Sequence, residues 1–493
     1  MITTLLILCL VMALVPVLGR SVTALSVLAL GLSTVVFGVG VYSSVPILFG
    51  APAMLQGGLW YIDAFSALML LLIVFVQWTG TLSSVSYLKT EFEEGAITLA
   101  QVRRYYMLLG LFVLSMIATV VSNNLGFMWV ALEATTLATT LLVAFYNKPG
   151  SLEAGWKYLI LCSTGISLGL VGLLCTYYAG FMVDFSTGLS AIDWTHLYEI
   201  APTLSPELMR VAFAFILIGF GTKVGLVPMH AWLPDAHSRA PSPISGMLSG
   251  VLLNAALFSI IRYKMIVDSS LGSTAWTNDL LLWFGVLSCV VPAAFILLQT
   301  DYKRLLAYSS IEHMGIMAFS IGIGGVGIIA AIIHMIGHAV IKSMLFFGAG
   351  NMVLRFKSTK FTRVHDVMRV MPYTGGFFLF GVLALLAVPP SPLFMSEYLM
   401  ISRGILEHPF ALLIVLIALA VVFAGFVRLI MPMLYSKQPI SAGEMSIPEE
   451  IGEHWTFTHA ALSLHLILIF VLGIFLWSVP GQLLLINIAQ VIL

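Results

Sequence analysis

The sequence predicts an all-α polytopic membrane protein, and two observations carry this prediction. Of the 493 residues, 60% are hydrophobic and only 9% are charged, whereas a soluble domain carries about 25% charged residues. Apolar stretches of about 20 residues also recur along the chain, and each is long enough to cross a bilayer as a helix. Lysine and arginine (22) balance aspartate and glutamate (22), so the composition gives no sign of nucleic-acid binding.

The apolar stretches predict about 14 transmembrane helices. The first stretch lacks a basic leader and a small-residue cleavage site, so we interpret it as a retained span. Most loop lysines and arginines fall on one side of the resulting topology, and the positive-inside rule then places both termini on the outer side. The expected spans are 2–18, 22–44, 60–82, 105–122, 124–146, 155–181, 208–229, 243–264, 278–298, 304–323, 326–351, 373–402, 408–435 and 456–478.

The fourth to eighth and the ninth to thirteenth spans form two groups of five. Lys223 and Glu397 are 174 positions apart, close to the offset between the groups. Because five is odd, consecutive copies insert with opposite topology, and inverted repeats with a broken helix in each are typical of ion-translocating proteins. The expected segments are 1–104 (an N-terminal three-helix segment), 105–264 (the first repeat), 278–435 (the second, inverted repeat) and 436–493 (a C-terminal helix and short tail).

Helix breaks are expected beside the charged residues of both groups. Pro228 interrupts the seventh span in GLVPMHAWLP, and PPSP at 389–392 interrupts the twelfth. Gly337 predicts a further break in the eleventh span. Proline removes a backbone donor and frees carbonyl groups, which can then bind water or side chains in a cavity lined by protein.

Four ionisable residues lie far from any loop: Glu133, Lys223, Lys342 and Glu397. A charge at mid-bilayer costs about 2.5–3.5 kcal/mol, so these residues must pair or line a hydrated path. A buried lysine releases its proton readily, and a nearby carboxylate restores the charged form, so Glu133 is the candidate partner of Lys223. A purely structural ion pair is the alternative.

His334, His338 and Lys342 follow one another at intervals of four and share one helix face. The two histidines could hold a metal, but zinc needs further ligands and lysine is a poor one, so we expect a hydrated relay and no metal. A third interpretation is that the two histidines merely form hydrogen bonds between helices. The four cysteines are scattered singly and no glycine-rich phosphate loop exists, so no cofactor site is expected in this chain.

Four long motifs resemble the antiporter-like subunits of respiratory complex I, membrane-bound hydrogenases and multisubunit cation/proton antiporters. They are KVGLVPMHAWLPDAHSRAPSPISGMLSG (223–250), DYKRLLAYSSIEHMG (301–315), HMIGHAVIKSMLFFGAG (334–350) and AVPPSPLFMSEY (387–398). SSIEHMG, with Glu312 before His313, is similar to the hydrogenase-4 component F and formate hydrogenlyase branch. Asn254 stands where many complex I subunits have lysine or histidine, so the resemblance leaves no relay residue on the eighth span.

The resemblance implies a proton-translocating role with distinct functions for these residues. Glu133 would modulate Lys223, Lys342 would be the central relay of the second half with the two histidines nearby, and Glu397 would exchange protons with the outside. Three further positions match family motifs: His230, Asp235 and His313. His230 would take part in proton transfer, and Asp235 and His313 would be accessory relay residues together with Glu312.

The resemblance also implies an assembly in the cell (inner or plasma) membrane. Its partners would be other membrane subunits and a peripheral redox arm, whose chemistry drives proton movement through this chain. The chain itself would be a non-redox subunit of an oxidoreductase complex. One alternative is a subunit of a multisubunit sodium/proton antiporter without a redox partner, and another is a scaffold that does not pump.

Overall fold

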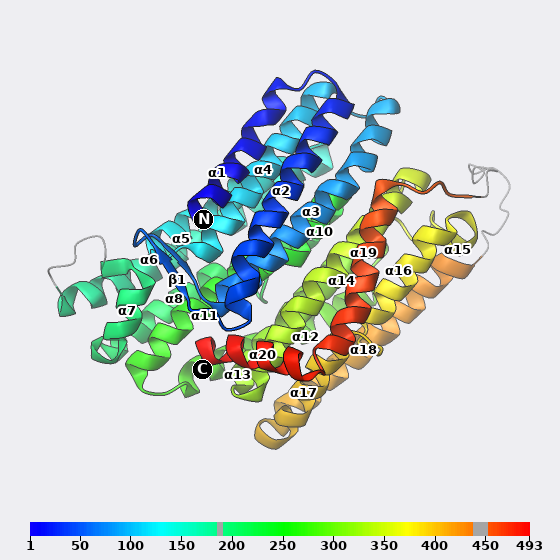
Figure 1. Cartoon of the computed structure of the whole chain (residues 1–493). Helices are drawn as coiled ribbons and strands as arrows, with labels where there is room; N and C mark the ends of the chain where they lie inside the picture. Colours follow the sequence, from blue (N-terminus) through cyan, green and yellow to red (C-terminus); the bar gives the residue numbers. More distant parts are fainter. Residues whose placement is uncertain (185–190, 437–451) are drawn as a thin grey trace.

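The computed structural model describes residues 1–184, 191–436 and 452–493, and this part of the chain is almost entirely helical (Figure 1). A short antiparallel hairpin of β1 (Met54–Gln56) and β2 (Trp60–Ile62) precedes the third helix. The helices are α1 (Ile2–Leu14), α2 (Val22–Leu48), α3 (Ala64–Glu93), α4 (Leu99–Val121), α5 (Leu125–Val143), α6 (Pro149–Val183), α7 (Trp194–Ile200), α8 (Pro206–Val224), α9 (Trp232–Arg239), α10 (Ser242–Met247), α11 (Leu253–Leu271), α12 (Ala275–Ile296), α13 (Tyr302–Ile323), α14 (Val326–Phe356), α15 (Val367–Val370), α16 (Pro372–Leu385), α17 (Pro392–Glu407), α18 (Pro409–Tyr435), α19 (Phe457–Phe475) and α20 (Val479–Ile492). Short 3-10 segments lie at Val15–Leu18 and Ala201–Thr203, and a π-helical turn, η4 (Leu248–Leu252), joins α10 to α11.

Ten helical spans in the described residues are long and apolar enough to cross a membrane. Three shorter apolar helices accompany them, at Ile2–Val17, Pro372–Leu385 and Val479–Ile492. The predicted class, a helical protein that crosses the membrane many times, is therefore confirmed. The count of 14 spans and the two repeats remain predictions.

The most deeply buried helices form the centre of the bundle. In the apolar window of each, all residues of the α10–α11 span, 94% of α14 and 83% of α3 are buried, compared with 33% for α2 and 39% for α18. The histidines and the lysine of α14 therefore face protein and not lipid. Figure 1 shows α14 inside the bundle, with α19 and α16 beside it.

Helices are interrupted at both proline-containing positions. α8 ends at Val224, where Gly225 takes a left-handed conformation (φ 82°) that favours glycine, and α9 begins only at Trp232. α16 ends at Leu385 and α17 begins at Pro392. The first interruption thus lies close to the buried Lys223 and the second to the half-buried Glu397.

The predicted break at Gly337 is wrong, because α14 runs without interruption from Val326 to Phe356. The glycine serves packing: a Cβ atom at this position would come within 2.8 Å of the Leu393 side chain and 3.1 Å of Pro392. A glycine inside a helix can thus mark close contact with a neighbouring helix, here α17, and not a break.

Three of the helices that carry the candidate site, α5, α13 and α17, begin at side-chain caps. Asn124 accepts a hydrogen bond from the backbone N–H of Phe127 at the start of α5, and Asp301 accepts one from Arg304 at the start of α13. Ser391 caps α17 in the same way. These caps satisfy backbone donors at the helix ends and fix where each helix begins.

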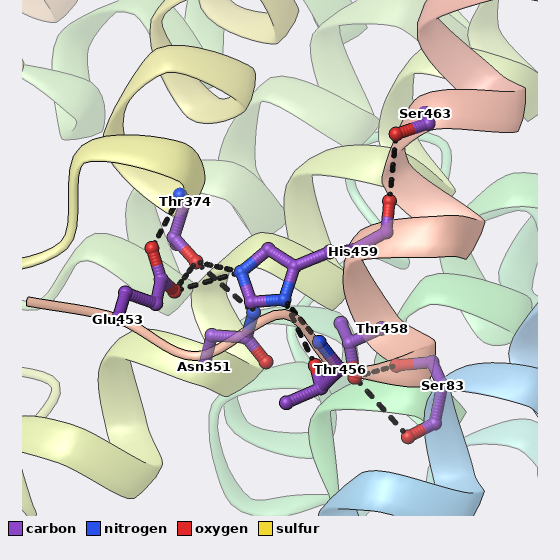
Figure 2. A network of polar contacts seen from close by, with 8 residues as sticks. All are labelled: Ser83, Asn351, Thr374, Glu453, Thr456, Thr458, His459 and Ser463. Atoms are coloured by element: carbon purple, nitrogen blue, oxygen red, sulfur yellow. Dashed lines mark hydrogen bonds and ion pairs between the residues drawn. The ribbon is translucent and has the colours of Figure 1, made fainter.

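A polar network holds the start of α19 against α14 and α16 (Figure 2). The Glu453 carboxylate accepts hydrogen bonds from the Thr374 backbone N–H (2.9 Å), the Thr374 hydroxyl and His459 Nε2 (2.8 Å). The backbone N–H of Thr456 donates to His459 Nδ1 (3.0 Å), so Nδ1 is an acceptor and Nε2 carries the proton of the neutral ring. Burial acts to raise the pKa of Glu453, but the hydrogen bonds from His459 and Thr374 outweigh it and hold the pKa below its ordinary value.

We predict that Glu453→Gln lowers the free energy of unfolding of the purified protein by about 1–3 kcal/mol at pH 7, because hydrogen bonds to an ionised acceptor are lost. The folded-state pKa lies below the unfolded value of about 4.3, so the stabilisation is complete above that value and is lost as the pH falls through the folded-state pKa. Melting curves from pH 3 to 8 should therefore show wild type and variant converging only at the acid end. A difference in melting temperature that stays constant down to pH 3 would contradict the lowered pKa of Glu453.

Candidate functional site

Lys223 is fully buried near the end of α8, and two hydroxyl groups accept its hydrogen bonds. Its Nζ donates to Thr136 Oγ1 (2.8 Å) and to Tyr158 Oη (2.7 Å). Thr136 in turn donates to Glu133 Oε2 (3.0 Å), and Ser163 donates to the other carboxylate oxygen (2.6 Å). The structure thus brings the predicted pair together through a threonine hydroxyl, not through direct contact.

Close packing of α6 and α8 brings Tyr158 to Lys223. A Cβ atom at Gly219 would lie 2.4 Å from the backbone nitrogen of Gly169, and one at Gly165 would lie 2.5 Å from Thr222. Glycines at these contacts let the two backbones approach, as is common between membrane helices.

On α14, His334, His338 and Lys342 lie on one face as predicted, and all three side chains are fully buried. The Lys342 ammonium donates to the Leu306 carbonyl (2.8 Å) and to the Ser309 hydroxyl, both on α13. In the described part of the chain no carboxylate lies within ion-pair distance of this lysine. Its charge is solvated by protein oxygen atoms.

The histidines form a ladder between α13, α14 and α17. His334 Nε2 and His313 Nδ1 are 2.8 Å apart, and His334 Nδ1 lies 2.9 Å from Ser396 Oγ. The His338 ring is 5.5 Å from that of His313, and neither of its nitrogens has a hydrogen-bond partner among the described residues. A buried ring with two open positions can bind water.

A cavity of about 270 Å³ connects the surroundings of Lys342 with Glu397. Ser309, Glu312, His313 and Glu397 line it, together with apolar side chains mainly of α18. Glu312 is 2% exposed, and its Oε2 lies 3.6 Å from His313 Nε2. The cavity has room for several water molecules between the two carboxyl groups.

The structure does not bring His230 and Asp235 into this row. His230 is half-buried in the turn after α8, and its Nδ1 has no hydrogen-bond partner within the residues described. Asp235 on α9 binds Lys157 (3.3 Å) and Arg304 (2.6 Å), and thereby ties α6 to α13. The two ion pairs give Asp235 a bracing role, and proton transfer by His230 stays a prediction.

Sequence reasoning missed the neutral side chains of the site: Thr136, Tyr158, Ser309 and Ser396. The signal available for them was hydroxyl residues clustered within apolar spans, as in LEATTLATT. It also missed His237, which is fully buried, has no partner at either ring nitrogen within the described chain, and stacks on Phe346 (5.3 Å between ring centroids), one helical turn beyond Lys342.

No group of three or more histidine, cysteine, aspartate or glutamate side chains in the described ranges is arranged to hold a metal ion. Asn254, just after the π-helical turn η4, donates to the carbonyl groups of Gly250 (3.0 Å) and Met335 (3.2 Å). It is a neutral link between α11 and α14 at the position where the resemblance left no relay residue.

Fold and site together define a polytopic membrane protein with lysine, histidine and glutamate side chains buried along its centre. The chain belongs to the family described as NADH:quinone oxidoreductase/Mrp antiporter, TM, whose model matches residues 122–424. It is thus an antiporter-like subunit related to those of hydrogenase-4 and NADH-quinone oxidoreductase.

The relatives place the chain within this family. A hydrogenase-4 component F homolog of Methylacidiphilum infernorum is 39% identical over 354 residues, covering 72% of this chain and 74% of the relative. Hydrogenase-4 component B of Escherichia coli is 29% identical over 68% of this chain and 49% of the relative, and NADH-quinone oxidoreductase subunit N of Desulforudis audaxviator is 25% identical over 78% and 75%. A chain in the structure of the membrane-bound sulfane sulfur reductase, an archaeal respiratory membrane complex, matches with a TM-score of 0.84 and 25% identity, covering 100% of this chain and 96% of that one.

We predict that Thr136→Val lowers the thermal stability by about 1–3 kcal/mol, because a buried ammonium and a carboxylate both lose a hydrogen-bond partner. Thr140→Val is the matched control, since among the described residues the Thr140 hydroxyl bonds only to a carbonyl of its own helix. Melting curves of the purified protein would measure both changes. Equal, small losses of stability in the two variants would show that the hydrogen bonds of Thr136 to Lys223 and Glu133 contribute little.

Proposed function

We propose that this chain is a proton-translocating membrane subunit of a complex I-like or group 4 hydrogenase-like oxidoreductase complex. Protons would move along the buried glutamate, lysine and histidine side chains and be driven by redox chemistry in partner subunits. Family membership supports the class of protein, and the arrangement of the buried residues supports the path.

The observation that carries the proposal is the cavity shared by Glu312, Glu397 and the hydroxyl partner of Lys342. A proton leaving Lys342 would pass by Ser309 to water in the cavity and from there to a carboxyl group. Such transfer needs heavy atoms within hydrogen-bond distance, directly or through one water molecule. The cavity supplies the space for this water on the way to Glu397.

The histidine ladder supports a second branch toward the same end. Its hydrogen bonds run from His313 through His334 to Ser396, the residue next to Glu397. In each neutral imidazole one nitrogen donates and the other accepts, so a row of such rings can pass a proton by exchanging these roles.

In the first half, Glu133 would control whether Lys223 keeps its proton. The threonine hydroxyl between them lets the carboxylate act on the ammonium without a direct ion pair. Because Glu133 is half-buried on α5, a change in its protonation or position would reach Lys223 through a single hydrogen bond. His237 stacks on Phe346 of α14, one helical turn from Lys342, and is our candidate for linking the two predicted repeats.

The proposed architecture has 14 spans, with both termini outside. It consists of the N-terminal segment 1–104, inverted five-helix repeats at 105–264 and 278–435, and a C-terminal segment 436–493. The helix interruptions after α8 and α16 support equivalent broken helices in the two repeats. Residues 437–451 and 185–190, which belong to loops of this topology, lie outside the described residues.

The proposed partners are other membrane subunits and a peripheral redox arm, in the plasma membrane. The similar proteins include hydrogenase-4 components and an NADH-quinone oxidoreductase subunit, and the similar structure is that of a respiratory complex. These likenesses favour a redox-coupled subunit over the sodium/proton antiporter without a redox partner.

We expect Lys342→Ala and Lys223→Ala, each assembled into the complex, to abolish most proton translocation per electron, since each removes a buried group that holds the proton. Proton release from vesicles during electron transfer would measure this, with complex assembly checked by native gel electrophoresis. Lys89→Ala is the control, because this lysine is 63% exposed and, in the part of the chain that the structure describes, paired only with Glu93. Normal proton yields in both buried-lysine variants would refute the proposal.

Glu312→Gln should reduce the proton translocation rate by roughly 10-fold or more, because a general acid–base group typically contributes at least 10²-fold and the histidine branch remains. If Glu312 and Glu397 act in series, the double Gln variant should be no slower than Glu397→Gln alone. The same vesicle assay gives the rates. If the Glu312 substitution instead slows translocation by the same factor in the Glu397→Gln background as in the wild type, Glu312 acts on a separate path.

A further inference from the structure

A second cavity, of about 540 Å³, lies where the predicted repeats meet on the face that the positive-inside rule makes cytoplasmic. The ends of α3, α9 and α14 and the starts of α6 and α13 surround it. None of the proposed relay residues lines it. Six cationic side chains line this cavity: Lys148, Arg239, Lys303, Lys357, Lys360 and Arg363.

The cationic side chains are poorly neutralised. Glu91 and Glu94 are the acidic residues that line the cavity, which leaves an excess of four positive charges. Glu94 is paired with Lys357, and Glu91 accepts a hydrogen bond from Tyr146 (2.7 Å). In the described ranges, no other cationic side chain of the cavity forms an ion pair.

Among these cationic side chains, Lys303 gives the strongest evidence that the cavity binds an anion. It is 3% exposed, and its ammonium, which has three hydrogens, donates to one acceptor in the described residues, the Ala240 carbonyl (2.7 Å). A buried cation with two open donors and no carboxylate in contact is costly unless an anion or water completes it.

We propose that this cavity binds an anion of the phosphate class, held by Lys303 at its buried side and by the exposed Lys148, Lys360 and Arg363 at its mouth. Arginine and lysine together are the side chains that recognise phosphate, and basic pockets between helices on the cytoplasmic side bind anionic lipid headgroups. The phosphate group comes from a lipid headgroup or from a soluble phosphate. Because the cavity touches both predicted repeats, the anion would hold them together at this face.

The test compares two triple variants of the full-length purified protein in detergent. Lys148→Gln/Lys360→Gln/Arg363→Gln removes three charges from the mouth of the cavity, and Lys89→Gln/Arg104→Gln/Arg369→Gln removes three exposed charges elsewhere on the same predicted face. Phosphatidylglycerol, inorganic phosphate and neutral phosphatidylcholine are added separately, and the melting temperature is followed as a function of concentration.

We expect phosphatidylglycerol or inorganic phosphate to raise the melting temperature of wild type and of the control triple. The cavity triple should bind that probe roughly 100-fold more weakly, at a factor of about five for each basic side chain. A response to inorganic phosphate identifies a soluble anion, and a response restricted to phosphatidylglycerol identifies a lipid headgroup. No response to either probe, or equal responses of the two triples, would overturn the proposal.

Discussion

The structure depends on how charged side chains are kept solvated inside a bundle that excludes bulk water. Lys223 and Lys342 are completely buried, yet each is held by two protein oxygen atoms and not by a carboxylate. Direct ion pairs would fix the charges in place, because separating a buried pair is strongly unfavourable. Hydroxyl and carbonyl partners stabilise the ammonium and still allow it to lose its proton.

A contrasting arrangement occurs between the middle of α11 and the start of α3. Arg262 and Asp63 form a direct buried ion pair (2.7 Å), and Arg262 also lies over the rings of Trp194 and Phe258. This pair locks α3 to α11, and Arg262 also donates to the Ser66 hydroxyl of α3 (2.8 Å). The protein thus uses direct ion pairs where helices are fixed and hydroxyl-bridged charges where we propose that protons move.

Sequence reasoning predicted the membrane class, the interruptions near Pro228 and at 389–392, and the shared face of His334, His338 and Lys342. These follow from local properties: hydropathy, proline chemistry and helical periodicity. The Gly337 break was wrong because the purpose of that glycine depends on α17, more than 50 residues away. Thr136, Ser309 and the cavity beside Glu312 were missed, because which hydroxyl meets which charge depends on how distant helices pack.

The unbroken α14 also has an electrical consequence. Its three titratable residues are fixed on one continuous helix, and from His334 to Lys342 the rise is about 12 Å. Along a membrane normal with a hydrocarbon core of about 30 Å, this distance is up to two fifths of the thickness. A proton that moves between these residues would therefore do work against the membrane potential of up to about 0.9 kcal/mol per 100 mV, so the rate of that step would depend on voltage.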